Sequence, residues 1–243
     1  DKLDKSNGYY IRKIGIIQHS IYGVDIQPIA TEISKLRSFL SLVVDENIDD
    51  AEPNRGIYPL PNLEFKFVTA NTLIGLKKHS IKTSSQAGEG FDFGGIGKDI
   101  DQLQQTRDQY LQSYGEKKEE LKKEFLRIQQ QIAYKEFSPK SSGQNKTAQQ
   151  IISWNPFSHE KSEWFETKWM FGIDVVDIVI GNPPYIQLQK QIPDNNTLKL
   201  ADLYSGEQYE TFTRTGDIYA LFFERGTEIL SENGFLCYIT SNK

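Results

Sequence analysis

The stretch DIVIGNPPYIQ, from Asp177 to Gln187, joins a hydrophobic strand pattern to an abrupt polar turn. The apolar run Val175–Ile180 has the length and β-branched composition of a buried parallel strand. Asn182 follows it directly, and then come Pro183 and Pro184, which cannot donate backbone hydrogen bonds to a sheet. A polar loop in this position lies at the carboxyl edge of a sheet, where open α/β folds bind ligands. The stretch therefore predicts an α/β fold with a site at this edge.

The loop carries a specific set of polar and aromatic groups. Asn182 offers a side-chain carbonyl as an acceptor, and Tyr185 offers a flat ring. Pro183 and Pro184 fix two φ angles and leave carbonyls with few local N–H competitors. This set suits a planar group with an exocyclic amine, although the same four residues alone could also form a plain turn after a strand.

Upstream, the chain reads as strand, helix and strand. Ile21–Ile26 forms a short strand pattern with Asp25 near its end, and a helix begins at Pro28. LEFKFVTANTL, residues 63–73, is the second strand. The helix has apolar residues at helical spacing, namely Ile29, Ile33, Leu36, Leu40 and Val43 or Val44.

A long helical insertion separates this part from the NPPY stretch. Residues 80–97 are rich in Ser and Gly and read as a loop, and residues 138–150 read as a polar linker. Between them, 98–136 predicts a helical arm or a hairpin with a possible break at Gly115. Its apolar positions are Ile100, Leu103, Tyr110, Tyr114, Leu121, Phe125, Ile128 and Ile132.

After the NPPY loop, residues 217–230 predict a helix with Ile218, Leu221 or Phe222, Arg225 and Ile229 one turn apart. Gly234 suits the left-handed position that ends such a helix, and FLCYIT, residues 235–240, predicts a fourth strand.

The composition limits the class of protein. The 243 residues include 25% charged side chains, a net charge of −5 and one cysteine, Cys237, which excludes an internal disulfide framework. No apolar run is long enough to cross a membrane, and no signal peptide begins the sequence, so we expect a cytoplasmic protein. The acidic balance argues against nucleic-acid contact over the whole surface.

The NPPY sequence after a hydrophobic strand resembles the catalytic motif of the N6-adenine DNA methyltransferases. The resemblance implies that Asn182, Pro183, Pro184 and Tyr185 form the catalytic loop. It implies that Asn182 and the Pro183 carbonyl accept from the amine of an adenine flipped out of double-stranded DNA, while Tyr185 stacks on the base. The implied fold is a Rossmann-like methyltransferase sheet, here partial and interrupted by the helical insertion.

Two further stretches resemble cofactor motifs of this family and imply S-adenosylmethionine as the methyl donor. In IYGVDIQPIATEISKLR, Asp25 takes the place of the acidic residue that binds the ribose hydroxyls, with Ile26 beside it. In FVTANTLIG, Asn71 takes the place of the residue that reads the cofactor's adenine, where many members carry Asp. Asp25 could instead be a solvated loop residue. Residues 216–243 resemble the following helix and strand, where Asp217 is a helix N-cap or a pocket residue.

The family's first cofactor motif, a Gly-rich loop before Asp25, is missing from the sequence. The letters FGGIG at 93–97 match it but stand after the other cofactor motifs, so we interpret them as a loop. We therefore expect a fragment, inactive alone, of a bacterial type IIG enzyme that fuses nuclease, methyltransferase and DNA-recognition parts. The expected division is a first core part at 1–79, the insertion at 80–163 and a second core part at 164–243.

Most DNA contacts would then come from a recognition domain outside this chain, and no metal site is expected. The His residues have no ligand spacing. Two alternatives stay open: a scaffold segment that keeps the motif without turnover, and a methyltransferase that modifies a glutamine amide in a protein.

Overall fold

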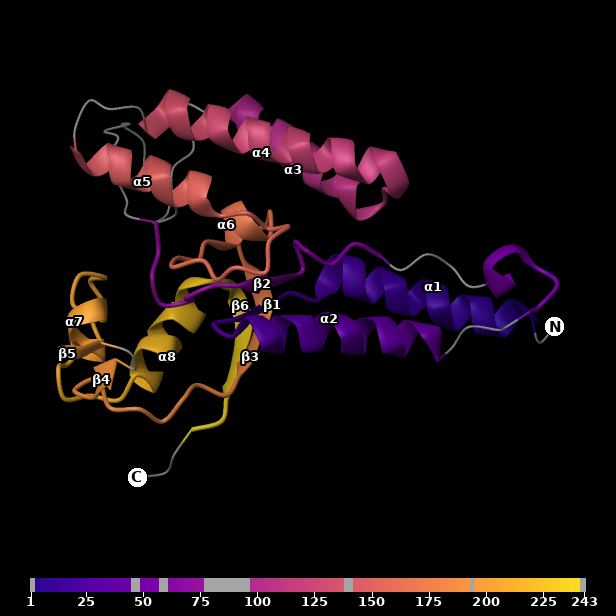
Figure 1. Cartoon of the computed structure of the whole chain (residues 1–243). Coiled ribbons are helices and arrows are strands. Elements are labelled where there is room, and N and C mark those ends of the chain that lie inside the picture. Colours follow the sequence, from indigo (N-terminus) through magenta and orange to yellow (C-terminus); the bar gives the residue numbers. More distant parts are fainter. Residues whose placement is uncertain are drawn as a thin grey trace. The chain divides into compact units, whose positions relative to one another are not determined.

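The computed structural model describes residues 3–44, 49–56, 61–76, 97–137, 142–192 and 195–240 (Figure 1). They form two compact units. Unit 1 contains Asp1–Ala70 and Leu76–Ser162, and unit 2 contains Asn71–Gly75 and Glu163–Lys243. Most of the predicted Ser/Gly-rich loop, including residues 93–96 of the FGGIG match, lies outside the described residues.

Unit 1 contains the predicted strand, helix and strand. β1 (Gly23–Asp25) and β2 (Phe67–Thr69) pair in parallel, with Asp25 opposite Thr69, and α2 (Pro28–Val43) connects them. The Thr31 and Thr69 hydroxyls lie 2.8 Å apart, so they tie the first turns of α2 to the end of β2. This part of the prediction is confirmed, and Asp25 ends its strand at the carboxyl edge.

The segment before β1 is a helix that the sequence reasoning did not predict. α1 (Leu3–Ser20) packs on α2 by a helical stripe that includes Tyr10 and Ile17, which are buried with Leu42, Leu63 and Phe67. The apolar residues from which α2 was predicted are not among these buried residues. They are 49–65% exposed, namely Ile29, Ile33, Leu36 and Leu40. The helix α2 therefore uses only part of its apolar surface within this chain.

The insertion is a helical hairpin followed by a third helix. α3 (Gly97–Leu111) and α4 (Gly115–Phe137) join at Gly115, whose φ of +58° is the left-handed conformation that glycine tolerates. The predicted hairpin is thus confirmed. Of the apolar positions proposed for it, Tyr114 is exposed.

A short turn, η1 (Pro53–Gly56), precedes β2.

An aromatic cluster attaches these helices to the segment before β2. Phe65 contacts the rings of Tyr110, Phe125, Trp154 and Phe157, with centroids 4.8–6.5 Å apart. Rings in such edge-to-face and tilted pairs stabilise beyond their area burial. The insertion is therefore part of the core of unit 1.

The predicted polar linker at 138–150 is wrong from Ser142 onward, because α5 (Ser142–Ser153) occupies it. Thr147, Ala148 and Ile151 are buried, so a short apolar stripe in a polar segment suffices to dock the helix beside α4. The Gln129 side-chain amide of α4 donates to the carbonyls of Ile151 and Trp154 and satisfies the end of α5.

Unit 2 holds the NPPY stretch. It contains α6 (Thr167–Met170), β3 (Val176–Gly181), a small antiparallel pair β4 (Gln191–Ile192) and β5 (Asn195–Lys199), α7 (Leu200–Tyr204), α8 (Tyr219–Glu228) and β6 (Leu230–Tyr238). β3 and β6 pair in parallel. The core consists of Leu73, Leu188, Ala201, Tyr204, Ile218 and Leu221.

Two predictions for this unit are wrong in detail. Gly234 does not end α8, because the helix stops at Glu228 and β6 begins at Leu230, which leaves Gly234 inside the strand. β3 is a strand in the predicted place, but it is not buried within the chain: Ile178 is 58% and Ile180 77% exposed. The reason is that the described residues supply β3 with one neighbouring strand only.

The chain is an α/β protein whose described strands form three two-stranded sheets, two parallel and one antiparallel. No helix in the described ranges has both the length and the apolar character to span a membrane.

Candidate active site at the end of strand β3

The NPPY loop lies where the sequence predicted, directly after a parallel strand at its carboxyl end. The Ile239 backbone N–H donates to the Gly181 carbonyl at 3.1 Å, so the chain after β6 runs beside the start of the loop. Pro183 is buried, whereas Asn182 and Tyr185 are exposed. The buried proline anchors the loop and leaves the side chains of Asn182 and Tyr185 at the surface.

Tyr185 is held by its hydroxyl. The hydroxyl donates to the Ile239 carbonyl at 3.1 Å and lies 3.4 Å from Asn182 Oδ1. The Tyr185 ring is 49% exposed, so part of its surface is available to a ligand. The loop therefore combines an exposed amide oxygen with a partly exposed aromatic ring whose tip is fixed.

Glycine is required where the loop begins, for reasons of space. A Cβ at Gly181 would lie 2.9 Å from the Tyr238 ring, and one at Gly226 of α8 would lie 2.6 Å from the Tyr238 hydroxyl oxygen. Real Cβ atoms are not found at such distances, so the ring of Tyr238 needs a glycine on each side. This packing places the Tyr238 ring of β6 between α8 and Gly181, the last residue of β3 before Asn182.

Behind the loop, the chain pairs with the segment that leads into α8. The Leu188 N–H donates to the Gly216 carbonyl at 2.8 Å, and the Ile218 N–H donates to the Ile186 carbonyl at 2.9 Å. Asp217 is therefore beside the chain that leaves the NPPY loop. The N-cap interpretation of Asp217 is wrong, because the N-cap residue of α8 is Ile218 and no side chain caps the helix.

Asp25 occupies the end of β1 in unit 1 with an exposed carboxylate. One oxygen, Oδ1, accepts from the Gln27 N–H at 2.7 Å, and within the described parts of the chain no hydrogen bond engages the other. The Asp25 backbone carbonyl accepts from the Ala70 N–H at 2.9 Å. The fixed carboxylate retains an oxygen that can accept from a ligand hydroxyl. Ile26 beside it is 44% exposed.

Asn71 is 4% exposed and already makes two hydrogen bonds within unit 2. Its Oδ1 accepts from the Leu73 N–H at 3.2 Å, and its Nδ2 lies 3.4 Å from the Tyr204 hydroxyl. Burial raises the pKa of Tyr204, so this hydroxyl stays protonated near neutral pH. The amide retains one lone pair and one N–H for a ligand.

The predicted site residues thus divide between the units. Asn71 belongs to unit 2 with the NPPY loop, and Asp25 and Ile26 belong to unit 1. Sequence reasoning missed Arg225, which it counted within the apolar series of α8. A cation at a core-facing helix position requires a partner, and that requirement was the available signal.

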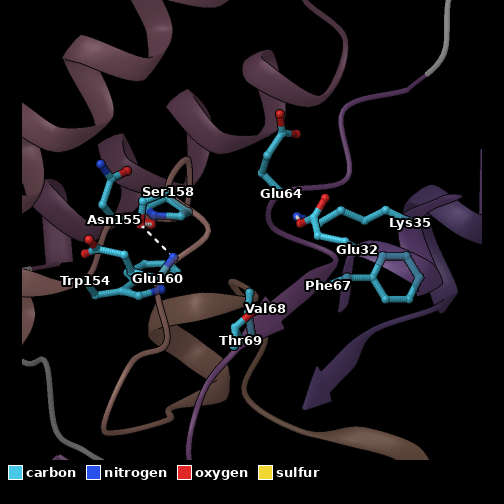
Figure 2. A pocket seen from close by; sticks show the side chains of 11 residues that line it. Glu32, Lys35, Glu64, Phe67, Val68, Thr69, Trp154, Asn155, Ser158 and Glu160 are labelled. Carbon is cyan, nitrogen blue, oxygen red and sulfur yellow. Dashed lines mark hydrogen bonds and ion pairs between the residues drawn. The ribbon is translucent and has the colours of Figure 1, made fainter. Parts of the chain in front are cut away.

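A small pocket in unit 1 contains none of the predicted site residues (Figure 2). It is lined by Glu32, Lys35, Glu64, Phe67, Val68, Thr69, Trp154, Asn155, Pro156, Ser158 and Glu160. Glu32 contacts Lys35 at 2.8 Å and His159 at 3.3 Å. Partial burial alone would raise the pKa of Glu32, but the Lys35 and His159 contacts lower it below the ordinary value. The Glu32 carboxylate is therefore already paired with Lys35 and His159.

The described residues contain no cluster of three or more His, Cys, Asp or Glu side chains that could hold a metal ion.

Comparison with known proteins gives related chains of greater length. A putative type II restriction enzyme and methyltransferase of Methanocaldococcus jannaschii is 27% identical over 281 aligned positions, which cover 95% of this chain and 22% of that protein. A type II restriction enzyme and methyltransferase of Escherichia coli is 32% identical over 42% of this chain and 9% of its own length. A type II methyltransferase of Geobacillus stearothermophilus is 28% identical over 39% of this chain and 18% of its own length.

The chain thus spans about a fifth of the relative that it matches over most of its own length. No solved structure matches it. The family model described as Eco57I restriction-modification methylase matches residues 19–243, a range that contains β1, β2, the helical insertion and the NPPY loop. By this match over most of its length, the chain belongs to the Eco57I restriction-modification methylase family.

Proposed function

We propose that the protein containing this chain transfers a methyl group from S-adenosylmethionine to the N6 amine of an adenine flipped out of double-stranded DNA. The observation that carries the proposal is the Asn182–Tyr185 loop at the carboxyl end of a parallel strand, in a member of a restriction-modification methylase family. The expected setting is a type IIG enzyme with a Rossmann-like sheet, since two of the relatives are named as combined restriction enzymes and methyltransferases.

The loop suits the recognition of an aromatic amine. Asn182 Oδ1 is exposed and can accept one amine hydrogen, while the Pro183 carbonyl can accept the other. Two acceptors favour a more pyramidal nitrogen and direct its lone pair. Tyr185 can stack on the base, which contributes roughly 1–3 kcal/mol for one base. Orientation of the nitrogen is the larger effect, since aligned reactants gain on the order of 7–11 kcal/mol.

The methyl donor fits the residues that the sequence assigned to it. The free carboxylate oxygen of Asp25 can accept from a ribose hydroxyl, and Ile26 adds an exposed apolar side chain beside it. Asn71 can use its remaining amide hydrogen and lone pair toward an adenine edge. S-adenosylmethionine, when bound, would supply an electrophilic methyl group, and its transfer to N6 would leave S-adenosylhomocysteine and release one amine proton to water.

The glutamine-amide alternative has no support from the relatives described above, whose names refer to restriction and methylation. The scaffold alternative concerns the isolated chain. We propose that the isolated 243 residues are inactive because the Gly-rich cofactor loop is absent from their sequence, and that recognition of DNA depends largely on a further domain.

The test uses Asn182→Ala in the full-length protein. In this variant the rate of transfer of tritiated methyl groups to DNA should fall at least about 100-fold, which is the loss expected when an active site loses one preorganised polar group. The circular dichroism spectrum should be unchanged. Gln189→Ala is the control, because this side chain is exposed and its hydrogen bond within the described part of the chain goes to the Gln187 side chain. Mass spectrometry of digested product DNA should find N6-methyladenine.

A folded Asn182→Ala protein with full activity, or methylated cytosine as the product, would refute the proposal. Tyr185→Ala should weaken capture of the flipped base. The readout is the fluorescence of 2-aminopurine placed at the target adenine, and equal signals for wild type and variant would contradict the stacking role.

A further inference from the structure

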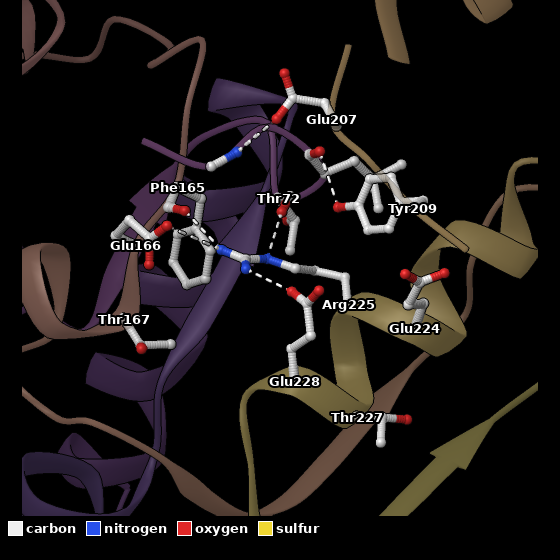
Figure 3. Close-up of polar contacts among 12 residues, drawn as sticks. Thr72, Phe165, Glu166, Thr167, Glu207, Tyr209, Glu224, Arg225, Thr227 and Glu228 are labelled. Carbon is white, nitrogen blue, oxygen red and sulfur yellow. Dashed lines mark hydrogen bonds and ion pairs between the residues drawn. The ribbon is translucent and has the colours of Figure 1, made fainter. Parts of the chain in front are cut away.

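The segment Asn71–Gly75 belongs to unit 2 although it directly follows β2 of unit 1. This segment carries Asn71, the residue proposed to read the cofactor's adenine. Its backbone lacks regular secondary structure in the described chain. The Phe165 N–H donates to the Ile74 carbonyl at 2.8 Å, and side chains of unit 2 bind the other carbonyls and N–H groups named below. The contacts that do so are shown in Figure 3.

Arg225 of α8 is the centre of these contacts. Its Nε donates to the Thr72 carbonyl at 3.1 Å, and its Nη2 donates to the Phe165 carbonyl at 2.8 Å. Its Nη1 donates to Glu228 at 2.8 Å, and Glu166 lies 3.6 Å away. The Arg225 side chain is 11% exposed, and both carboxylates hold its charge. A planar guanidinium with several fixed donors defines the position of each carbonyl that it binds.

Tyr209 holds the next residue of the segment. Its hydroxyl donates to the Leu73 carbonyl at 2.9 Å, and the Gly75 N–H donates to Glu207 at 3.2 Å. Burial raises the pKa of Tyr209, so its hydroxyl remains a donor at neutral pH. Leu73 connects this contact to the site, because its N–H donates to Asn71 Oδ1 at 3.2 Å. The Leu73 N–H shares a peptide unit with the Thr72 carbonyl that Arg225 binds, and Tyr209 holds the next peptide unit, so a shift of either moves the donor that orients the Asn71 amide.

We propose that Arg225 and Tyr209 are positioning residues of the cofactor site, which orient the Asn71 amide by holding the carbonyls of Thr72 and Leu73. The inference rests on the proposed function, in which Asn71 reads the cofactor's adenine. α8 also packs against β6 through Gly226, and β6 pairs with β3, the strand that precedes the NPPY loop. Arg225 of α8 therefore links the Asn71 segment to the element that supports the NPPY loop.

The test measures discrimination between two cofactor products by the full-length protein. Calorimetry compares S-adenosylhomocysteine with the analogue whose adenine amine is replaced by a carbonyl. Wild type should prefer the adenine form, and Asn71→Ala should lose that preference.

Tyr209→Phe removes a single hydroxyl, and Arg225→Lys keeps the charge but loses the planar set of donors. Each should bind S-adenosylhomocysteine roughly tenfold more weakly, because a misplaced group loses its hydrogen-bond geometry.

Two readouts separate positioning from a general structural role. For Tyr209→Phe, the rate of methyl transfer at saturating cofactor should stay within about twofold of wild type, since this hydroxyl binds the Leu73 carbonyl and not the NPPY loop. Tyr209→Phe combined with Asn71→Ala should bind S-adenosylhomocysteine no more weakly than Asn71→Ala alone, because coupled groups are not additive. Arg214→Met is the matched control and should bind as wild type does, because the exposed Arg214 side chain pairs with Asp202 and, among the described residues, with no other carboxylate.

Tyr209→Phe and Arg225→Lys proteins that bind and discriminate as wild type would overturn the inference while the proposed function stands. Full additivity of Asn71→Ala and Tyr209→Phe would also overturn it. A wild-type protein that binds neither compound would refute the proposed function, and the inference with it.

Discussion

Lys66 is a buried cation whose removal should stabilise the protein at neutral pH. It precedes β2, is 4% exposed, and its Nζ lies 3.8 Å from the centre of the Tyr22 ring. Burial lowers the pKa of Lys66 to about 8; Asp108 opposes the shift and the nearby cation of Arg107 adds to it. We predict that Lys66→Met, which keeps the volume and removes the charge, increases the free energy of unfolding at pH 7.

The size of the effect follows from the two pKa values of Lys66. The unfolded chain holds the proton with the ordinary pKa of 10.5, whereas the folded chain holds it with a pKa of about 8. The unfolded state therefore binds more protons between these values, and stability rises with pH across this window. The cost of burying the charge is at most about 3 kcal/mol below pH 8 and falls to about 1 kcal/mol at pH 9.5.

The Tyr22 ring offsets part of this cost, by roughly 1 kcal/mol, because a cation over an aromatic face is stabilised. Lys66→Met should thus gain about 2 kcal/mol at pH 7. The gain should fall to about 1 kcal/mol at pH 9.5, where the folded Lys66 is neutral and the ring no longer offsets the cost. The measurement is urea unfolding of the 243-residue chain, followed by far-ultraviolet circular dichroism, whose signal comes mostly from the longer helices α1 to α5 of unit 1.

Lys117→Met is the control for this experiment, because Lys117 is an exposed residue of α4 that pairs with Glu120. It should change stability by less than about 0.5 kcal/mol at either pH. A Lys66→Met variant that is less stable than wild type at pH 7 would refute the reasoning. So would a gain that stays the same at both pH values.

Two further predictions concern packing and helix ends. Gly226→Ala should destabilise the chain by about 1–3 kcal/mol, because its Cβ would lie 2.6 Å from the Tyr238 hydroxyl oxygen. Gly15→Ala in α1 should instead stabilise the chain by up to about 1 kcal/mol, because no atom lies within 4 Å of the new Cβ. Thermal unfolding measures both variants, and melting temperatures that shift in the same direction would contradict the packing. Asn62→Ala should cost about 2 kcal/mol in urea unfolding, since the buried amide donates to two carbonyls at the end of α3 at 2.6 and 2.8 Å. An Asn62→Ala chain as stable as wild type would show that water replaces these bonds.

The elements with strong local signals could be predicted from the sequence. Pro28 marks the start of α2, the apolar spacing through Phe125 marks the helical hairpin, and Gly115 marks its turn. The NPPY loop after β3 was also predictable, because a β-branched run that ends in two prolines has few other solutions. These features depend on residues close together in the chain.

Other elements depend on partners that the sequence does not identify. α5 forms in a segment of polar composition because Ile151 and its neighbours dock beside α4, where Gln129 completes its last turn. β6 begins directly after α8 because it pairs with β3 from Leu230, which displaces Gly234 from the expected helix end. In both cases a tertiary contact determined the structure against a weak local preference.

The site shows the same division. The sequence by itself determined the chemistry: an amide, two prolines and a tyrosine at Asn182–Tyr185, a carboxylate at Asp25 and an amide at Asn71. Only the tertiary structure showed that the Asn71 segment belongs to the unit of the NPPY loop. Arg225 and Tyr209 hold it there through backbone carbonyls. Every residue has a carbonyl, so such a contact leaves no pattern in the sequence, and its partner becomes known only when the chain is folded.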